Sequence, residues 1–422
     1  MTPRMTPRIT RADGLRVLQL TDFYPPVLGG LERVVADLSA SLARRGAEVV
    51  VGTLSAAPRQ EPGVPVQRLG STLGRLPGAH SDGTRPFHPP FPDPLTVRDL
   101  HRLVADVRPD VVHVHSWILN SWLPLRRCWP ATRTVAYAHD YGLFCPRKTD
   151  QRTAEGPGCG TPGALRCARC AAVQYGPVRA AALGPGLRAM RRATRSVDAL
   201  VAVSSAVADT LASALDVARP VVIPPAVDLV TDPDPPRPDV LPPGPYVLYV
   251  GQLAPHKGFD VLLDAVRSVP GLQLVVLGLP KEGWTPPRDP AVTVLTDVPH
   301  DVVMAAWRHA AVGAVPSRWA DPMPLVTLEA MAQGCPLVAS RVGGLVDAVD
   351  DGVTGVLVPP GDATALAAAL DRIVRDPDLR HRMGTAARAR SAAFHLDAVT
   401  DRWIELYTQL TGERAGEVRA WR

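Results

Sequence analysis

The sequence contains no run of about eighteen consecutive apolar residues, the length that a membrane-spanning helix needs. Its opening segment, MTPRMTPRITRADG, also lacks the apolar core of a secretory signal peptide. Hydrophobic residues make up 46% of the 422 positions but are dispersed between polar ones, as in ordinary globular proteins. These features predict a cytoplasmic protein in which residues 1–14 are a flexible N-terminal segment.

Aromatic residues are scarce, at 5% of the chain, and no lysine- or arginine-rich run is interleaved with them. This composition argues against a dedicated nucleic-acid-binding protein. The net charge of +5 would suit an anionic substrate, or at most peripheral contact with an acidic membrane surface, although basic stretches such as residues 188–195 are more often solvated faces. The 45 prolines and the high arginine content suggest a GC-rich bacterial source.

The first eighty residues predict a βαβ unit. Residues 15–20 form an apolar strand, Gly29 and Gly30 a turn, residues 31–42 a helix with one apolar stripe, and residues 48–54 the next strand. Open α/β sheets bind ligands at such a turn, where glycine permits close approach and the free amides of the helix attract an anion. The turn does not have the G-x-G-x-x-G pattern, which argues against a dehydrogenase, and a Gly-Gly pair can also be a plain tight turn.

Alternating strands and helices divide the chain into two domains. The first continues with apolar strands at residues 110–115, 132–138, 197–203 and 221–223, and the second has them at 246–250, 272–277, 292–295, 312–315 and 337–339. Between them lies the proline-dense stretch DLVTDPDPPRPDVLPPGP. We expect an α/β protein with two doubly wound Rossmann-like domains facing across a cleft: residues 15–228, a linker at 229–244, residues 245–395, and a C-terminal helix within 396–422 that returns to the first domain.

The second domain carries the sharper signals for a site. Asp321 and Glu329 stand eight positions apart, and Glu329 is the only charged residue in PLVTLEAMAQG. A carboxylate among apolar side chains is costly unless it is paired, although Glu329 could also lie on an exposed helix face. Gly251 ends a strand, and Lys257 precedes a helix beginning near Gly258, so a cation and a helix N-terminus converge there as at a phosphate site. A lysine in that position can equally be solvent-exposed.

Several ordered motifs resemble glycosyltransferase family 4, the retaining, nucleotide-sugar-dependent enzymes with the GT-B fold. The resemblance runs from about residue 15 to residue 410. Its motifs are YPPVLGGLERVVADLSASLARRGAEV, DVVHVH, AHDYGLFCPR, IPPAVD, VGQLAPHKGFDVLLDA, PLVTLEAMAQGCPLVAS and GGLVDAVDDGVTGVLVPPGD. Their order and spacing are hard to explain by chance.

The resemblance implies roles for individual residues. The family's E-x7-E motif falls on Asp321 and Glu329, so Glu329 would accept hydrogen bonds from the ribose hydroxyls, and Asp321, one methylene shorter than the usual glutamate, would face the donor sugar. The family's diphosphate-binding arginine and lysine fall on Gln252 and Lys257, which leaves Lys257 and the helix N-termini to neutralise the leaving group. The predicted donor-binding residues are Gly29, Gly30, Gly251, Gln252, Lys257, Asp321, Pro324, Leu325 and Glu329.

Histidines provide the polar groups expected from the first domain. His113 and His115 lie on one face of a predicted strand, and the resemblance implies a role near the donor sugar for His115, whereas His113 is expected in the core. His139 and Asp140 end the next strand and are candidates for contact with sugar or acceptor. Each histidine could instead be a hydrogen-bonded structural residue. The predicted catalytic residues are therefore His115, Lys257, Asp321 and Glu329.

The resemblance implies a retaining transfer of a hexose-type sugar from a nucleoside diphosphate sugar, with a UDP-sugar favoured. The acceptor would be a hydroxyl of a glycan, a lipid-linked saccharide or a small metabolite. The similar enzymes are thought to react on one face of the sugar, the departing phosphate taking the acceptor's proton, so no metal or other cofactor is expected in catalysis. Lys257 and amides near Gly29, Gly30 and Gly344 would stabilise the leaving group. A sugar-nucleotide epimerase of the same fold and a non-catalytic nucleotide-sugar-binding protein are the alternatives.

Cysteines support a separate hypothesis. Four of the six have the pattern C-x13-C-x7-C-x2-C inside a Gly-, Pro- and Arg-rich insertion, residues 145–170, after HDYGLFCPR. In a reducing compartment this clustering favours a structural zinc site made of Cys145, Cys159, Cys167 and Cys170. Free thiols or a labile disulfide are the alternative.

Overall fold

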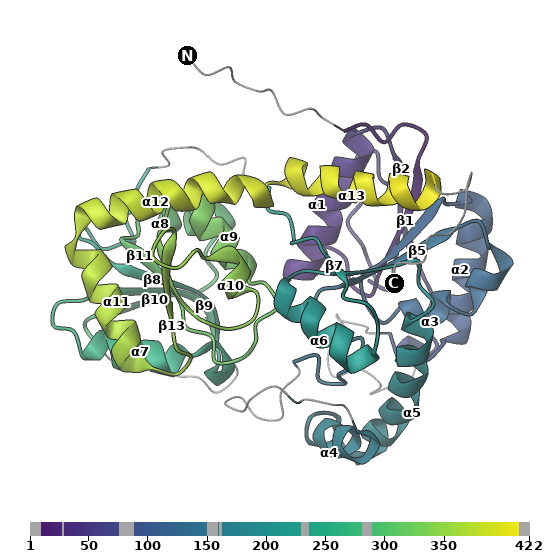
Figure 1. Cartoon of the computed structure of the whole chain (residues 1–422), viewed down its shortest axis with the longest axis horizontal. Coiled ribbons are helices and arrows are strands. Elements are labelled where there is room, and N and C mark those ends of the chain that lie inside the picture. The colour runs from purple at the N-terminus through teal and green to yellow at the C-terminus, as the bar shows by residue number, and fades with distance from the viewer. Residues whose placement is uncertain are drawn as a thin grey trace.

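The computed structural model describes residues 10–27, 29–75, 88–149, 159, 163–228, 236–280 and 289–412. Parts of four predicted segments lie outside them: residues 1–9 of the N-terminal segment, residues 150–158 and 160–162 of the cysteine-rich insertion, residues 229–235 of the linker and residues 413–422 at the C-terminus. Two sheets, each covered by helices, occupy the two ends of the elongated molecule (Figure 1).

The first sheet has seven described strands in the order β3-β2-β1-β4-β5-β6-β7, all pairing in parallel. Its strands are β1 (Arg16–Thr21), β2 (Glu48–Thr53), β3 (Val66–Arg68), β4 (Val111–Val114), β5 (Arg133–Ala138), β6 (Ala199–Ala202) and β7 (Val221–Val222). The accompanying helices are α1 (Gly30–Arg44), α2 (Pro94–Val107), α3 (Leu119–Trp122), α4 (Ala164–Tyr175), α5 (Pro177–Thr194) and α6 (Ser205–Leu215), with 3-10 helices η1 (Leu73–Arg75) and η2 (Leu125–Cys128).

The second sheet has six described strands in the order β10-β9-β8-β11-β12-β13, again parallel. They are β8 (Val247–Leu253), β9 (Leu274–Pro280), β10 (Val292–Leu295), β11 (Val312–Val315), β12 (Leu337–Ser340) and β13 (Gly355–Val358). The helices are η3 (Pro255–Lys257), α7 (Phe259–Arg267), α8 (His300–His309), α9 (Leu325–Ala332), α10 (Leu345–Ala348), α11 (Ala363–Arg375), α12 (Pro377–Ser391), η4 (Ala392–Phe394) and α13 (Leu396–Gly412).

This architecture confirms the predicted fold class, two doubly wound α/β domains. In both sheets the central strands are buried, which explains why their sequences are nearly continuous runs of Val, Leu and Ala rather than alternating patterns. The sequence prediction omitted β3 and β13, both at sheet edges. Over the described residues, none of the helices combines the length and the apolar character needed to cross a membrane.

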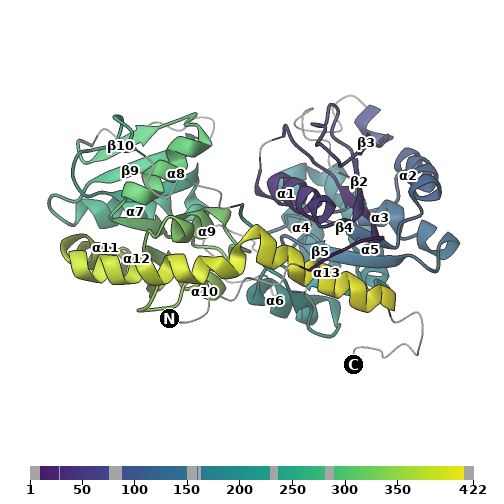
Figure 2. The ribbon, with the colours of Figure 1, turned by 90° about the horizontal axis from the view of Figure 1, so that it is seen from above.

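Helix α13 leaves the second domain and lies against the first (Figures 1 and 2). Its Asp397 and Asp401 pair with Arg45, just past the end of α1, at 2.9 and 2.5 Å, and Thr400 Oγ1 donates to Ser41 Oγ at 2.9 Å. Arg45 is only 6% exposed, so removing these carboxylates would leave a nearly buried charge unpaired. The C-terminal helix is therefore part of the first domain's packing.

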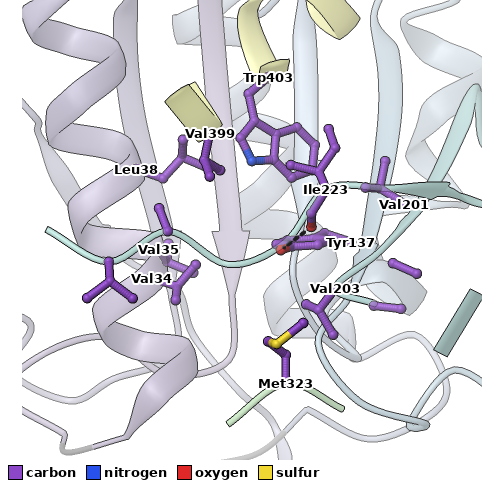
Figure 3. Close-up of a cluster of buried hydrophobic side chains, with 14 of the residues drawn as sticks. Val34, Val35, Leu38, Tyr137, Val201, Val203, Ile223, Met323, Val399 and Trp403 are labelled. Atoms are coloured by element: carbon purple, nitrogen blue, oxygen red, sulfur yellow. Dashed lines mark hydrogen bonds between the residues drawn. The ribbon is translucent and has the colours of Figure 1, made fainter. Parts of the chain in front are cut away.

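A cluster of buried apolar side chains joins α1, the first sheet, α13 and the second domain (Figure 3). Trp403 of α13 packs edge-on against Tyr137 of β5, with ring centroids 4.9 Å apart. The Tyr137 hydroxyl donates to the carbonyl oxygen of Ile223 at 2.8 Å. Met323, from the loop before α9 in the second domain, belongs to the same cluster. The two domains are thus in apolar contact directly beside the cleft.

Candidate active site between the domains

A pocket of about 470 Å³ lies between the two domains, large enough for a small organic ligand. The first domain contributes Gly29, Gly30, Leu31, Arg33, Val34, His139, Asp140, Val203 and Pro225. The second contributes Tyr249, Val250, Gly251, Gln252, Lys257, Ala314, Val315, Pro316, Ser317, Asp321, Met323, Pro324, Leu325, Val326 and Glu329. All the predicted donor-binding residues line this pocket, as do His139 and Asp140, but His115 does not.

Glu329 lies in the middle of α9, whose residues 327–331 are all buried. Its Oε1 accepts a hydrogen bond from Arg33 Nη1 of the first domain at 2.8 Å and lies 3.0 Å from Nε2 of His300, the first residue of α8. Burial pushes the pKa of Glu329 upward, but the hydrogen bond with His300 and the charge of Arg33 outweigh it, so its pKa lies below the ordinary value. Glu329 is therefore a buried, paired carboxylate, and the exposed alternative is wrong.

Lys257 and Asp321 form an ion pair, with Nζ and Oδ2 2.5 Å apart. Asp321 is 4% exposed, and Ser317 Oγ lies 3.4 Å from the same oxygen. Gly258, directly after Lys257, has φ +70°, and a Cβ there would lie 1.9 Å from the carbonyl oxygen of Pro316, so only glycine fits. Without a ligand, the first carboxylate of the E-x7-E motif thus binds the lysine rather than pointing freely toward a sugar.

Gly251 and Gln252 lie near the end of β8, at the carboxyl edge of the second sheet. The Tyr249 hydroxyl donates to the carbonyl oxygen of Gln252 at 2.7 Å, which ties the turn back onto its own strand. Gln252 adds a neutral polar side chain to the pocket wall. The position where the family resemblance places an arginine therefore has no charge in this chain.

The Gly29-Gly30 turn forms the opposite wall, and α1 begins at Gly30. A Cβ on Gly30 would lie 3.2 Å from Leu325 Cδ1 of the second domain, so the two domains approach closely there. A Cβ on Gly29 would lie 2.1 Å from Oε2 of Glu32, whose carboxylate folds back on the first turn of α1. Glycine at both positions makes this approach possible.

The second glycine turn has a different role from the one expected. The Gly344 amide donates to the carbonyl oxygen of Asp321 at 2.8 Å, so it is occupied within the second domain rather than facing a leaving group. Gly343 has φ +54°, and a Cβ there would lie 2.1 Å from the same carbonyl oxygen. The Gly343-Gly344 turn therefore supports the loop that carries Asp321 and does not line the pocket.

The histidines of the first domain form a chain that runs inward from the pocket wall. His139 lines the pocket, and its Nε2 lies 2.9 Å from Nδ1 of His115, whose Nε2 lies 2.6 Å from Gln19 Oε1. His115 is 2% exposed, so it positions His139 rather than touching the pocket. His113 is fully buried, and its Nδ1 lies 2.6 Å from the hydroxyl of Tyr407 on α13.

Burial keeps this chain uncharged. It lowers the pKa of His139 to about 3 and the pKa values of His113 and His115 well below the ordinary value, with neighbouring histidines adding to the effect at those two. Burial raises the pKa of Asp140, and the Lys148 charge offsets part of that rise. The wall of the first domain thus presents a neutral imidazole beside a carboxyl group with raised proton affinity.

The four clustered cysteines do not form a metal shell in the part of the chain that the structure describes. No group of three or more His, Cys, Asp or Glu side chains there is arranged to hold a metal ion, and Cys145, Cys159, Cys167 and Cys170 form no disulfide bonds. Cys145 is buried in the apolar core, whereas Cys167 and Cys170 lie on α4. The zinc site remains a sequence prediction.

Two polar side chains at the site were missed by the sequence prediction: Arg33 and His300. Arg33 lies in the first turn of α1, three positions after the Gly29-Gly30 turn. Its closeness to that predicted ligand-binding turn is the sequence feature that could have identified it. His300 begins α8 and comes from a segment with no recognised motif. Both meet at Glu329, where His300 Nε2 also lies 3.0 Å from Arg33 Nη1.

Two doubly wound parallel sheets with a charged pocket between their carboxyl edges have the architecture of the GT-B fold. A family model described as Glycosyltransferase Family 4 matches residues 28–231, and one described as Glycosyl transferases group 1 matches residues 237–390. A D-inositol 3-phosphate glycosyltransferase from Xylanimonas cellulosilytica is 31% identical over 92% of this chain and 93% of the relative. The chain belongs to glycosyltransferase family 4.

Solved structures agree on the fold. Sucrose-phosphate synthase from Thermosynechococcus elongatus superposes with a TM-score of 0.70 at 23% identity, over 94% of this chain and 99% of that one. The Anabaena protein HepE, in complex with UDP and glucose, superposes with a TM-score of 0.65 at 16% identity, over 94% and 100%. At these identities the likeness establishes the GT-B architecture.

Proposed function

We propose that this glycosyltransferase moves a hexose from a UDP-sugar to an acceptor hydroxyl with retention of anomeric configuration. The proposal rests on the presence of two groups of the second domain in one pocket: a buried, ionised Glu329 and the cation Lys257. Opposite them lie the Gly29-Gly30 turn and the start of α1. A nucleoside diphosphate sugar needs these three elements: an acceptor for ribose hydroxyls, a cation for the diphosphate, and backbone that permits close approach.

The arrangement suits a reaction in which the diphosphate leaves and the acceptor oxygen attacks from the same side. Lys257 and the N-terminus of α1 would stabilise charge that develops on the departing phosphate oxygen, and that oxygen would take the proton of the acceptor hydroxyl. His139 and Asp140 would hydrogen-bond the sugar or the acceptor. Closure of the two domains over the donor would exclude water from the pocket and limit hydrolysis of the donor.

UDP and glucose bound to HepE, and the name of the Xylanimonas relative, support the choice of donor base and direct the choice of acceptor. The acceptor is a hydroxyl of a glycan, a lipid-linked saccharide or a small metabolite. Among small metabolites, D-inositol 3-phosphate is the first to test because the relative's name contains it.

A thermal-shift screen of UDP-, GDP-, ADP- and dTDP-sugars tests the donor, since a ligand that binds only the folded state raises the melting temperature in proportion to its affinity. The UDP-sugars should give the largest shift. Incubation of that donor with candidate acceptors should then release UDP and form a glycoside whose anomeric configuration, measured by NMR, matches the donor's. An inverted product would refute retention. If UDP binds but no acceptor yields product until Asp321→Glu is introduced, the protein is a nucleotide-sugar-binding protein instead.

A further inference from the structure

The charged groups that line the described pocket are unevenly matched to the proposed donor. Its two permanent cations are Arg33 and Lys257, and its carboxyl groups are Asp140, Asp321 and Glu329. Without a ligand each cation already has a carboxylate: Lys257 binds Asp321, and Arg33 binds Glu329. A diphosphate entering this pocket would add negative charge to a site whose carboxyl groups already outnumber its cations. One lysine, shared with Asp321, leaves most of that charge uncompensated.

Arg33 is well placed to supply the missing charge. It lies in the first turn of α1, three positions after Gly30, so its guanidinium and the free amides at the start of α1 line the same pocket. Its side chain is 33% exposed and so retains room to move, unlike Glu329 at 5%. A guanidinium has five donors and grips phosphate oxygens in pairs, so it can leave Glu329 or share its donors between the carboxylate and a phosphate.

We propose that Arg33 binds the diphosphate of the donor and replaces, from the opposite domain, the arginine whose place is taken by Gln252. Arg33 Nη1 lies 2.8 Å from Glu329 Oε1, an oxygen that the ribose would use, and donor binding would transfer the guanidinium from that carboxylate to the phosphates. Because Arg33 belongs to the first domain and Glu329 to the second, the same side chain also couples phosphate binding to domain closure. This inference rests on the proposed function, since it requires a nucleoside diphosphate in the pocket.

The test compares UDP with uridine, which has the ribose but no phosphate, by isothermal titration on the full-length protein. Arg33→Ala should weaken UDP binding by about 10- to 100-fold, the equivalent of one or two charge-assisted hydrogen bonds, and leave uridine binding unchanged or slightly tighter. Arg44→Ala, which removes an exposed arginine from the last turn of the same helix, is the matched control and should bind both ligands like the wild type. Arg33→Lys, which keeps a charge, should lose less than Arg33→Ala.

The double variant Arg33→Ala with Gln252→Arg is the more specific test, because it moves the positive charge from the first domain to position 252 of the second domain. It should recover most of the lost UDP affinity. If Arg33→Ala loses equal affinity for UDP and uridine, or loses affinity for neither, the proposal is overturned. If it loses affinity for UDP alone and Gln252→Arg does not restore that affinity, then Arg33 does not replace the arginine expected at position 252. If the wild type binds neither UDP nor any other nucleoside diphosphate, the proposed function itself fails.

Discussion

The two walls of the pocket hold their polar groups by different physical means. On the second domain, Glu329, Lys257 and Asp321 are charged and held by ion pairs. On the first domain, His139 lies at the end of a chain of buried neutral histidines. Fixed charges suit a ligand that is itself charged, whereas a neutral imidazole suits hydroxyl groups, which exchange hydrogen bonds without a change of charge. Under the proposed function, the ribose lies on the second domain, the diphosphate between Lys257 and Arg33, and the sugar and acceptor beside the neutral histidine of the first domain.

The largest effect is expected on the charged wall, at the proposed ribose contact. Glu329→Ala should abolish the thermal shift given by the donor, because two charge-assisted hydrogen bonds to ribose together contribute about 3–5 kcal/mol. The pKa of Glu329 lies below its ordinary value, so it remains ionised, and the wild-type shift should be unchanged between pH 8 and pH 5.5. An unaltered thermal shift in the variant would refute ribose binding by Glu329. It would also refute the placement of the nucleotide on the charged groups of the second domain.

Lys257→Ala should lower kcat by about 100- to 1000-fold, the effect of removing one preorganised group from a developing negative charge. Donor affinity should fall as well, because without the lysine Asp321 is left unpaired beside the phosphates. Steady-state kinetics with the donor selected by the screen measures both quantities. Lys257→Arg is the charge-preserving control, and a kcat within tenfold of wild type in Lys257→Ala would contradict a role in leaving-group stabilisation.

The second-domain wall was largely predictable from sequence, because its residues lie in short motifs at the ends of successive strands. Gly251, Gln252 and Lys257 follow β8, and Asp321 through Glu329 follow β11, so the rule that ligands bind at the carboxyl edge of a parallel sheet brings them together. The strands β3 and β13 were missed because three or four residues between glycine- or proline-containing turns carry too little periodicity.

The first-domain wall was less predictable because its arrangement depends on contacts between distant segments. Arg33 and Glu329 are 296 positions apart and meet only once both domains are in place. His115 directly follows β4, as expected for a site residue, but Gln19 on the neighbouring β1 binds its Nε2 and keeps its ring behind His139. His113 is enclosed by Trp403 and Tyr407 of α13; a C-terminal helix returning to the first domain was predicted, but its contact with this histidine was not.

The neutral wall predicts an acid-dependent loss of stability. The pKa of His139 falls from 6.5 in the unfolded chain to about 3 in the folded one, so its contribution is fully present above pH 6.5 and declines as the pH falls toward 3. At pH 5 this histidine alone should lower the free energy of unfolding by about 2 kcal/mol relative to pH 7. Chemical denaturation of the wild type and of His139→Asn at the two pH values measures this loss. Between pH 7 and pH 5 the free energy of unfolding of the variant should fall by about 2 kcal/mol less than that of the wild type. Equal losses would show that burial does not lower the pKa of His139.

The smallest effect is expected from a contact that spans the two walls. The Tyr141 hydroxyl of the first domain donates to the carbonyl oxygen of Ala320, next to Asp321, at 2.9 Å, whereas the Tyr137 hydroxyl makes an equivalent bond to Ile223 within the first domain. Removing either hydroxyl deletes one neutral hydrogen bond, about 1 kcal/mol. Tyr141→Phe should therefore raise the donor KM about fivefold with little change in melting temperature, because the bond forms only when the domains are together. Tyr137→Phe should lower the melting temperature and leave the KM unchanged, and the reverse pattern would mean that the contact between the walls is not part of the active state.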